Sequence, residues 1–163
     1  TLKPAFIKDG TITPANASSI SDGAAALVMT RQSVAEKLGL PVVARVVATS
    51  AHAHAPSKFT TAPVPAIRKA LAKAGWSVED VDLFEVNEAF AVVAMIAARD
   101  LNIPAEKLNV NGGATALGHP IGASGARIMA TLIAALENRG LKRGVASLCI
   151  GGGEATAVAL ELV

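Results

Sequence analysis

The sequence predicts an α/β fold in which a mixed, mostly parallel sheet carries helices on both faces. Strand-like and helix-like segments alternate along the chain, which is typical of parallel strands connected by helices. The last two strand-like segments are separated only by a short glycine-rich turn, so this pair is expected to be antiparallel. With 163 residues, 52% of them hydrophobic, the chain is long enough for one domain with a substantial core.

The first half of the chain supplies two predicted strands and two predicted helices. Residues 23–30 form an apolar run that predicts a short buried strand, and residues 31–38 follow as a helix that Gly39 ends. Residues 42–49 are rich in β-branched side chains, which favours a strand. Residues 64–74 place apolar side chains at helical spacing, with lysines on the other face, and are predicted to be helical.

The second half alternates in the same way. Two helices are predicted there, a mostly apolar one at residues 87–100 and the longest helix of the chain at residues 122–138. The predicted strands lie at residues 81–86, 108–110, 145–150 and 155–163.

Charge and cysteine content exclude several classes of protein. Lysine and arginine total 15 against 13 acidic residues, and no basic cluster of the kind that binds nucleic acid or an acidic membrane is present. The longest apolar run, residues 89–98, is shorter than the about 20 residues that a membrane-spanning helix needs. Cys149 is the only cysteine and forms no internal disulfide, which suits a reducing compartment. We therefore expect a cytoplasmic protein, with any targeting segment lying upstream.

Three loops that follow predicted strands carry small or reactive residues, at 87–90, 111–125 and 149–154. In open α/β sheets, ligands bind beyond the carboxyl ends of the strands. If the preceding strands are neighbours, these loops meet at one edge of the sheet, and we expect the chemistry there.

Within these loops, His119 and Cys149 stand out. His119 lies among closely spaced glycines before a long helix, and Cys149 ends an apolar strand and precedes three glycines. The residues alone suggest a Cys–His nucleophilic pair with glycine N–H groups as an oxyanion hole and Asn87 orienting the histidine. The alternatives are a structural histidine beside a buried apolar cysteine, or a phosphate-binding loop, although the GxxxxGK[ST] pattern is missing. His52 and His54 lack a third ligand, so no metal is predicted.

Several segments resemble the thiolase family. The three C-terminal thiolase signatures are matched, in family order, by NEAFA at residues 87–91, NGGATALGHPIGASGAR at residues 111–127 and CIGGG at residues 149–153. Further matches are KPAF at residues 3–6, NAS at residues 16–18 and SDGAAAL at residues 21–27, so the resemblance covers nearly the whole chain. Ketoacyl synthases share the thiolase fold but usually carry a pair of histidines in place of this Asn, His and Cys set.

The resemblance implies a thiolase-like α/β fold in which residues 1–163 are the C-terminal domain, without the N-terminal domain that carries the nucleophilic cysteine. It implies an acyltransferase that performs Claisen condensation and thiolysis of acyl-CoA thioesters, most simply an acetyl-CoA C-acetyltransferase. A longer-chain 3-ketoacyl-CoA thiolase and a non-catalytic CoA-binding or assembly domain are the alternatives. CoA enters as part of the substrate and no other cofactor is expected. The expected partners are a thiolase N-terminal domain and further copies of the protein, and the chain alone is expected to be inactive.

The resemblance also replaces the Cys–His pair with other roles. It implies that His119 activates the absent nucleophile and stabilises the thioester oxygen, and that Asn87 holds a water in the same oxyanion hole. Cys149 becomes the acid and base at the α-carbon of acetyl-CoA, which requires neighbours that lower its pKa toward working pH. The N–H of Gly151 belongs to a second oxyanion hole.

For the substrate, the resemblance implies contacts from the N-terminal segment and from the NEAFA loop. The implied substrate-binding residues are Phe6, Ala17, Ser18, Phe59, Ala89 and Phe90. Two segments depart from the family pattern: TPANASS at residues 13–19 replaces a common TAGNASG, and the loop at residues 53–63 lacks the Met-Gly pair that many biosynthetic members carry near Phe59. We also expect a large exposed apolar surface, because half of a thiolase subunit packs against the other half.

Overall fold

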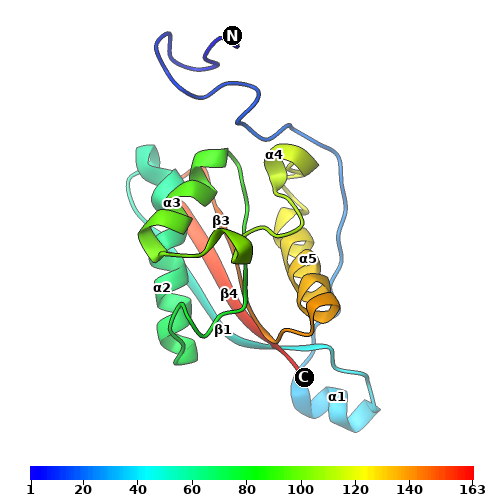
Figure 1. The fold of residues 1–163 in the computed structure, drawn as a ribbon. Coiled ribbons are helices and arrows are strands. Elements are labelled where there is room, and N and C mark those ends of the chain that lie inside the picture. Colours follow the sequence, from blue (N-terminus) through cyan, green and yellow to red (C-terminus); the bar gives the residue numbers. More distant parts are fainter.

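A four-stranded sheet with the strand order β1-β4-β3-β2 forms the centre of the computed structural model, which describes residues 1–163 (Figure 1). In chain order the elements are α1 (Gln32–Leu38), β1 (Ala44–Ala53), the 3-10 helix η1 (Pro56–Thr61), α2 (Pro63–Ala74), β2 (Leu83–Val86), α3 (Ala91–Leu101), the 3-10 helix η2 (Ala105–Lys107), α4 (Ala114–Leu117), α5 (Ser124–Arg139), β3 (Arg143–Cys149) and β4 (Glu154–Leu162). The α/β class and the mixed sheet predicted from the sequence are confirmed.

The pairing of the strands differs from the prediction in one respect. β3 and β4 form the expected antiparallel hairpin across the glycine-rich turn, and β1 pairs antiparallel with β4. Only β2 and β3 are parallel. The expectation that most pairings would be parallel is therefore wrong, because the second strand of the hairpin is also the partner of β1.

Helices cover both faces of the sheet, as predicted. Figure 1 shows α2 and α3 on one side and α5 on the other. The period of two along β2 explains the two cores: Phe84 and Val86 join the larger core under α2 and α3, whereas Leu83 joins Leu132 in the smaller core under α5. No helix of this structure combines the length and the apolar character that crossing a membrane requires.

Three helices end at a glycine, as predicted for the helix at residues 31–38. Gly39, Gly75 and Gly140 adopt left-handed backbone conformations directly after α1, α2 and α5, with φ of 61°, 70° and 64°. A residue without a Cβ adopts this conformation at no steric cost, which is why glycine ends so many helices. The four predicted helices are confirmed, but α3 begins only at Ala91, because residues 87–90 form a loop.

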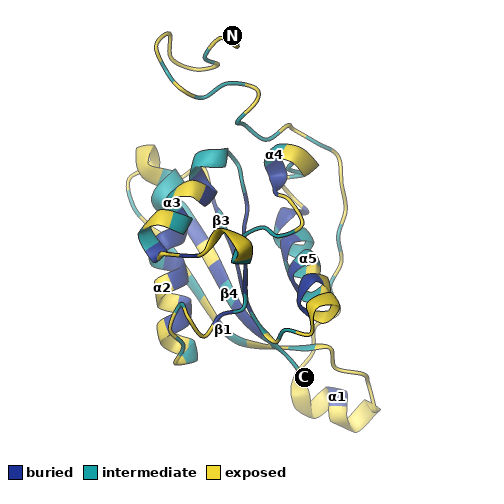
Figure 2. Ribbon diagram, in the orientation of Figure 1, coloured by how far each residue is buried: buried dark blue, intermediate teal, exposed yellow.

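Residues 23–30, predicted to be a short buried strand, form no strand. They run in an extended path beside α5 and are largely exposed (Figures 1 and 2). Val28 is 98% exposed and Met29 66%. A strand needs a neighbour for its backbone N–H and C=O groups, and no strand of this chain lies beside the segment. The segment is apolar, as the sequence shows, but its side chains are left largely exposed to solvent.

The short strand predicted at residues 108–110 is replaced by a turn that a side chain completes. Leu108 forms a single bridge to Phe84, and Asn109 then adopts a left-handed conformation with φ of 47°. The Asn109 side chain takes over the pairing: Oδ1 accepts from the N–H of Val86 at 2.8 Å, and Nδ2 donates to its C=O at 2.9 Å. An asparagine amide thus extends the sheet where the backbone turns away.

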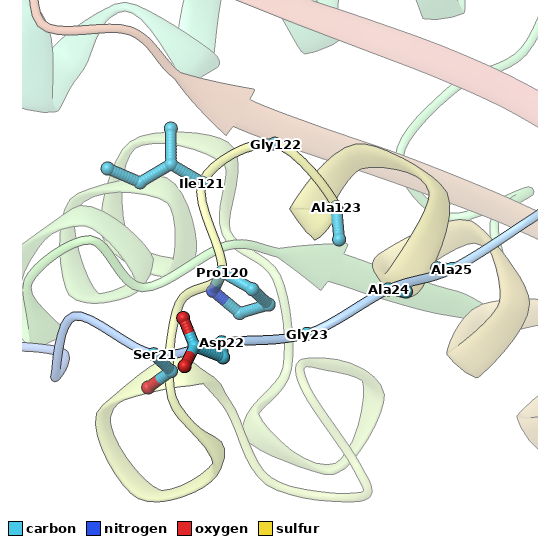
Figure 3. Close-up of a pocket in the computed structure, with 9 residues that line it drawn as sticks. All are labelled: Ser21, Asp22, Gly23, Ala24, Ala25, Pro120, Ile121, Gly122 and Ala123. Carbon is cyan, nitrogen blue, oxygen red and sulfur yellow. The ribbon is translucent and has the colours of Figure 1, made fainter.

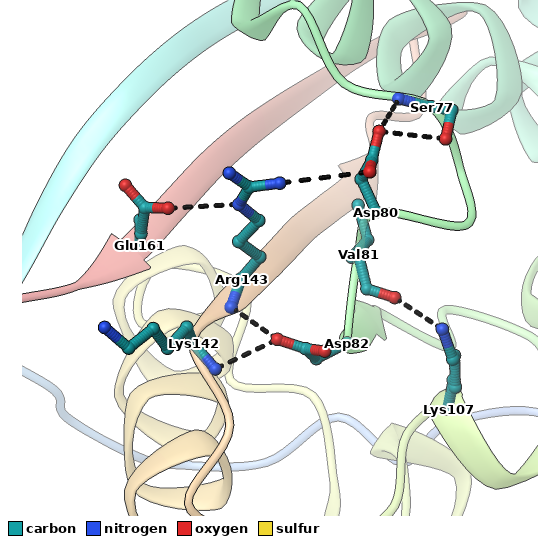
Figure 4. A network of polar contacts seen from close by, with 8 residues as sticks. All are labelled: Ser77, Asp80, Val81, Asp82, Lys107, Lys142, Arg143 and Glu161. Atoms are coloured by element: carbon teal, nitrogen blue, oxygen red, sulfur yellow. Dashed lines mark hydrogen bonds and ion pairs between the residues drawn. The ribbon is translucent and has the colours of Figure 1, made fainter.

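A polar network closes the end of the sheet opposite the end of β3 at Cys149 (Figure 4). Asp82 Oδ2 accepts from the backbone N–H groups of Lys142 and Arg143 at 2.9 and 2.8 Å. Arg143 Nε donates to Glu161 on β4 at 3.0 Å, and its guanidinium lies 3.9 Å from Asp80. These contacts fix where β3 begins beside β2, and hence the register of the parallel pair.

We predict that Asp82→Ala lowers the free energy of unfolding by about 1–3 kcal/mol, because two backbone N–H groups lose a charged acceptor. Urea denaturation followed by circular dichroism measures this change. Asp100→Ala is the matched control, since that carboxylate contacts only the exposed neighbour Arg99. Equal stability of the two variants would contradict the prediction.

Candidate active site

The parallel pairing of β2 and β3 brings two of the three predicted loops to one edge of the sheet. Val86 lies opposite Ser147, and the next residue, Asn87, donates its backbone N–H to the C=O of Ser147 at 2.9 Å. Cys149 ends β3 two residues later. The third loop arrives from the other side, where His119 Nε2 lies 3.2 Å from Asn87 Nδ2. Asn87 and His119, expected to act together, are in hydrogen-bond contact.

His119 is held at both ring nitrogens. Its Nδ1 lies 2.6 Å from Ser124 Oγ, at the first residue of α5, and Ser124 Oγ in turn donates to the C=O of Pro120 at 2.9 Å. Burial lowers the pKa of His119, and the positive charge of Arg127 lowers it further. Both effects favour the uncharged ring, in which one nitrogen is unprotonated, as a general base requires.

Cys149 is buried at the end of β3, and burial raises the pKa of its thiol. The groups around Cys149 in this chain do not supply the lowered pKa that its role as a base requires, because apolar surroundings penalise the thiolate. The ring nitrogens of His119 bond to Asn87 and Ser124 and not to Cys149. The Cys–His nucleophilic pair suggested by the residues alone is therefore not formed.

The turn after Cys149 presents a backbone donor. Gly153 donates to Ile150 at 3.0 Å and Ile150 donates to Glu154 at 2.8 Å, whereas the exposed Gly151 gives its N–H to no acceptor of the chain. Gly153 has φ of 100°, and a Cβ there would collide with the carbonyl oxygen of His54. The turn thus depends on glycine for its shape and leaves the Gly151 N–H free for a ligand.

The N-terminal segment docks onto the NEAFA loop and onto His119. The backbone N–H and the hydroxyl of Ser18 both donate to the C=O of Ala89, at 3.1 and 2.9 Å, and Ala17 bridges to Phe90. His119 donates its backbone N–H to Ser19 at 3.1 Å. The predicted substrate-binding residues Ala17, Ser18, Ala89 and Phe90 therefore lie together, with the Ser18 hydroxyl already bonded within the chain.

Three phenylalanines gather beside this contact. The ring of Phe90 meets Phe6 edge-on at 5.9 Å between centroids, and meets Phe59 at 6.1 Å. Phe6 is 72% exposed. Phe59 and Phe90 are half-buried and pack against the larger core, so the cluster reaches from that core to the exposed ring of Phe6.

Sequence reasoning missed the residues that shape the NEAFA loop from below. Glu88 Oε1 accepts from Asn109 Nδ2 at 3.2 Å and Oε2 accepts from the backbone N–H of Thr115 at 3.1 Å. The carboxylate fills the space beside Gly113, where any Cβ would collide with it. Both Glu88 and Gly113 belong to the quoted motifs, but only their contact in space reveals the role.

It also missed a buried ion pair next to Asn87. Arg127 Nη2 donates to Asn87 Oδ1 at 3.2 Å, and Nη1 lies 3.8 Å from Glu85 Oε2. The side chain of Glu85 is only 3% exposed. Burial raises its pKa to about 7, against the opposing charge of Arg127 and with a further rise from Glu88. A charged residue inside a strand that otherwise reads as apolar was the available signal.

His52 and His54 lie next to each other at the end of β1. Their rings meet edge-on at 5.1 Å between centroids, and Lys69 Nζ lies 3.1 Å from His52 Nδ1. No group of three or more His, Cys, Asp or Glu side chains in the structure is arranged to hold a metal ion.

An open groove of about 380 Å³ lies beside the His119 loop (Figure 3). Residues 21–25 form one wall and residues 120–123 the other, and a Cβ on Gly23 would collide with Pro120. His119 itself does not line the groove. The groove is where the extended segment at Gly23 packs closely on Pro120, just before α5 begins.

Comparison with protein families assigns the chain to one family over nearly its whole length. Residues 40–162 match the family model described as the C-terminal domain of thiolase, and residues 1–33 match the model of the thiolase N-terminal domain. The chain belongs to the thiolase family.

Individual relatives agree with this assignment. The chain is 54% identical over 162 residues to the cytosolic acetyl-CoA acetyltransferase of Mus musculus and 51% identical over 160 residues to the acetyl-CoA acetyltransferase of Allochromatium vinosum. These alignments cover 98% of the chain but only 41% of either relative, so the chain spans about two fifths of their length.

Solved structures show the same relation. The acetyl-CoA acetyltransferase of Bacillus anthracis superimposes with a TM-score of 0.96 at 48% identity, and the human mitochondrial 3-ketoacyl-CoA thiolase with 0.92 at 45%. Each comparison covers 99% of the chain and 41% of the solved structure. The family resemblance and the fold predicted from the motifs are confirmed.

We predict that iodoacetamide alkylates Cys149 in the folded chain at pH 7.5 at least roughly tenfold more slowly than a free cysteine, because burial raises the thiol pKa and the thiolate is the reactive form. Mass spectrometry over time gives the rate, and the chain unfolded in urea is the control. A folded-state rate equal to that of the unfolded chain would show that the thiol is neither buried nor shifted.

We also predict that Glu85→Gln raises the free energy of unfolding by an amount that depends on pH. The folded pKa of Glu85, about 7, lies above the ordinary value of 4.5. The cost of burying its charge is therefore absent below pH 4.5 and complete above pH 7. The variant should stabilise the chain by about 2 kcal/mol more at pH 8 than at pH 5, as measured by urea denaturation. The exposed Glu106→Gln is the control, and an equal effect of Glu85→Gln at both pH values would refute the prediction.

Proposed function

We propose that this chain forms the C-terminal part of an acetyl-CoA acetyltransferase, an acyltransferase that joins two acetyl-CoA molecules into acetoacetyl-CoA and CoA and also runs the reverse thiolysis. The observation that carries the proposal is the position of the uncharged His119. It bonds to Asn87 at the edge where β2 and β3 end, and the same edge carries Cys149 and the free N–H of Gly151.

His119 serves this chemistry as the base that activates a nucleophile. The only cysteine of the chain is the buried Cys149, so the nucleophilic thiol comes from the N-terminal half of the enzyme. A neutral imidazole takes the proton of that thiol and, as imidazolium, stabilises negative charge on the thioester oxygen. Asn87 then holds the water that completes this oxyanion hole.

Cys149 moves the second proton. Because burial keeps it a protonated thiol at neutral pH, it acts first as an acid that protonates the departing CoA thiolate. The thiolate left behind then removes a proton from the α-carbon of acetyl-CoA. The free Gly151 N–H lies two residues further along and serves as a donor to the oxygen of the resulting enolate.

CoA is the substrate carrier in this proposal, and no further cofactor takes part. The human mitochondrial 3-ketoacyl-CoA thiolase that matches this chain at 45% identity is described in complex with CoA. The cluster of Phe6, Phe59 and Phe90, in which Phe6 is the exposed ring, offers an apolar wall for the pantetheine and acyl parts, next to Ser18 and Ala89.

The proposed partners are the thiolase N-terminal domain and further copies of the enzyme. Support comes from exposed apolar side chains concentrated in residues 2–46, among them Phe6, Ile20 and Val28 at 72%, 96% and 98% exposed. Surfaces of this kind are typical of protein interfaces. We place the enzyme in the cytoplasm, which the single free cysteine and the similarity to a cytosolic relative support.

The test is thiolysis of acetoacetyl-CoA by the protein that combines this chain with its N-terminal half. His119→Ala should lower kcat by roughly 10²–10⁴-fold, the usual contribution of a general base. His52→Ala is the matched control and should leave the rate unchanged, because its ring meets His54 and Lys69 and makes no bond to Asn87 or His119. An unaltered rate for His119→Ala would remove this residue from the mechanism.

The same assay separates the alternatives. A longer-chain 3-ketoacyl-CoA thiolase would show a higher kcat/KM with long-chain substrates than with acetoacetyl-CoA. A non-catalytic CoA-binding or assembly domain would bind CoA but give no turnover even with the N-terminal half present.

A further inference from the structure

Arg127 belongs to the GHPIGASGAR motif, yet the proposed chemistry gives it no part. Its guanidinium lies in the interior between β2 and α5, with the side chain 20% exposed. It donates to Asn87 Oδ1 at 3.2 Å and lies 3.8 Å from the Glu85 carboxylate. A buried arginine is costly unless its contacts are specific.

Secondary structure brings these groups together. Glu85 and Asn87 are two residues apart at the end of β2, and alternation along a strand turns both toward α5. Ser124 and Arg127 are three residues apart on α5, so both lie on the helix face that meets the strand. His119 lies between the two pairs, bonded to Asn87 on one side and to Ser124 on the other.

Arg127 decides which way the Asn87 amide points. A guanidinium donates hydrogen bonds and accepts none, so its neighbour on the amide must be the oxygen Oδ1. The amide nitrogen Nδ2 then points at His119 Nε2, 3.2 Å away. The flipped amide would set Nδ2 against Arg127, donor against donor, and is excluded.

The donor-to-acceptor direction of these hydrogen bonds continues through His119. Because Asn87 Nδ2 donates, His119 Nε2 accepts and carries no proton, so the proton of the neutral ring is on Nδ1. Nδ1 donates to Ser124 Oγ at 2.6 Å, and the Ser124 hydroxyl donates to Pro120 at 2.9 Å. The series thus runs from Arg127 Nη2 to the backbone C=O of Pro120, with one donor and one acceptor at each step.

We propose that Arg127 is a positioning residue for this site: through the Asn87 amide it fixes neutral His119 in the tautomer whose Nε2 is unprotonated, and Glu85 is its buried counter-charge. Arg127 does not touch the reacting atoms. The proposed function uses this unprotonated Nε2 to accept the thiol proton, when the thiol takes the place of the Asn87 amide as donor, and in that respect the inference rests on the proposed function.

Glu85 balances the positive charge of Arg127 in this partly buried site. The charged groups that act on the ring and on its neighbours are Arg127, Glu85 and, more remotely, Glu88. Without Glu85 the guanidinium would be a buried cation with no counter-ion. The 3.8 Å separation leaves Glu85 near Arg127 without a close hydrogen bond, so the amide of Asn87 keeps its guanidinium donor.

Histidine tautomers are read directly from the ring ¹⁵N shifts and two-bond ¹H–¹⁵N couplings of the ¹⁵N-labelled chain at pH 7.5. His119 should show a protonated Nδ1 and an unprotonated Nε2. In Arg127→Gln the new amide pairs with either orientation of Asn87, so only the Ser124 contact still favours one form, and the single tautomer should give way to a mixture. Arg127→Lys keeps a charged group that only donates and should retain the single tautomer. Arg139→Gln, at the exposed end of α5, is the matched control and should change nothing.

Three results would overturn the inference: a protonated Nε2 in the unsubstituted chain, an unchanged tautomer in Arg127→Gln, or the same loss in Arg127→Lys as in Arg127→Gln. If Arg127→Gln does not fold because Glu85 is left alone, Glu85→Gln/Arg127→Gln removes both charges and should show the same tautomer loss; an unchanged tautomer in this double variant also overturns the inference. The measurement needs no substrate, so its outcome is independent of whether the proposed activity is found.

Discussion

The parallel pairing of β2 with β3 is the constraint on which the rest of the site depends. Parallel strands end at the same edge of a sheet, so the register that sets Val86 opposite Ser147 also sets Asn87 beside the last residues of β3. Asp82 holds that register from the other end. A shift of one residue would turn Asn87 away from α5, and His119 would lose its amide partner.

Around this pairing the interior is unusually polar for a small domain. Glu85, Asn87, Ser124 and Arg127 lie between one face of β2 and α5, where apolar packing would be simpler. Burial raises the pKa of Glu85 to about 7, which indicates that its charge is held at a cost. Functional sites commonly violate the rules that stabilise a core, and the apolar cores under α2 and α5 offset that cost.

Much of this could be predicted from the sequence. The helices and most strands follow from apolar periodicity and glycine stops, and glycine density together with the thiolase motifs singled out Asn87 and His119. The strand predicted at residues 23–30 was wrong because an apolar run predicts burial, whereas this segment is largely exposed and has no strand to pair with. The orientation of Asn87 by Arg127 joins residues 40 positions apart, and no local pattern encodes a contact of that kind. The raised pKa of Cys149 likewise depends on tertiary burial.

The docking of the N-terminal segment has a mechanical consequence. Residues 1–33 match the model of one thiolase domain and residues 40–162 that of the other, yet the backbone bonds of Ser18 to Ala89 and of His119 to Ser19 cross between them. Rotation of this segment about the residues that join the two matched regions would pull directly on the backbone of His119. The two matched regions are therefore hydrogen-bonded to each other at the site itself. The residues that join them cannot act as a free hinge without breaking these bonds.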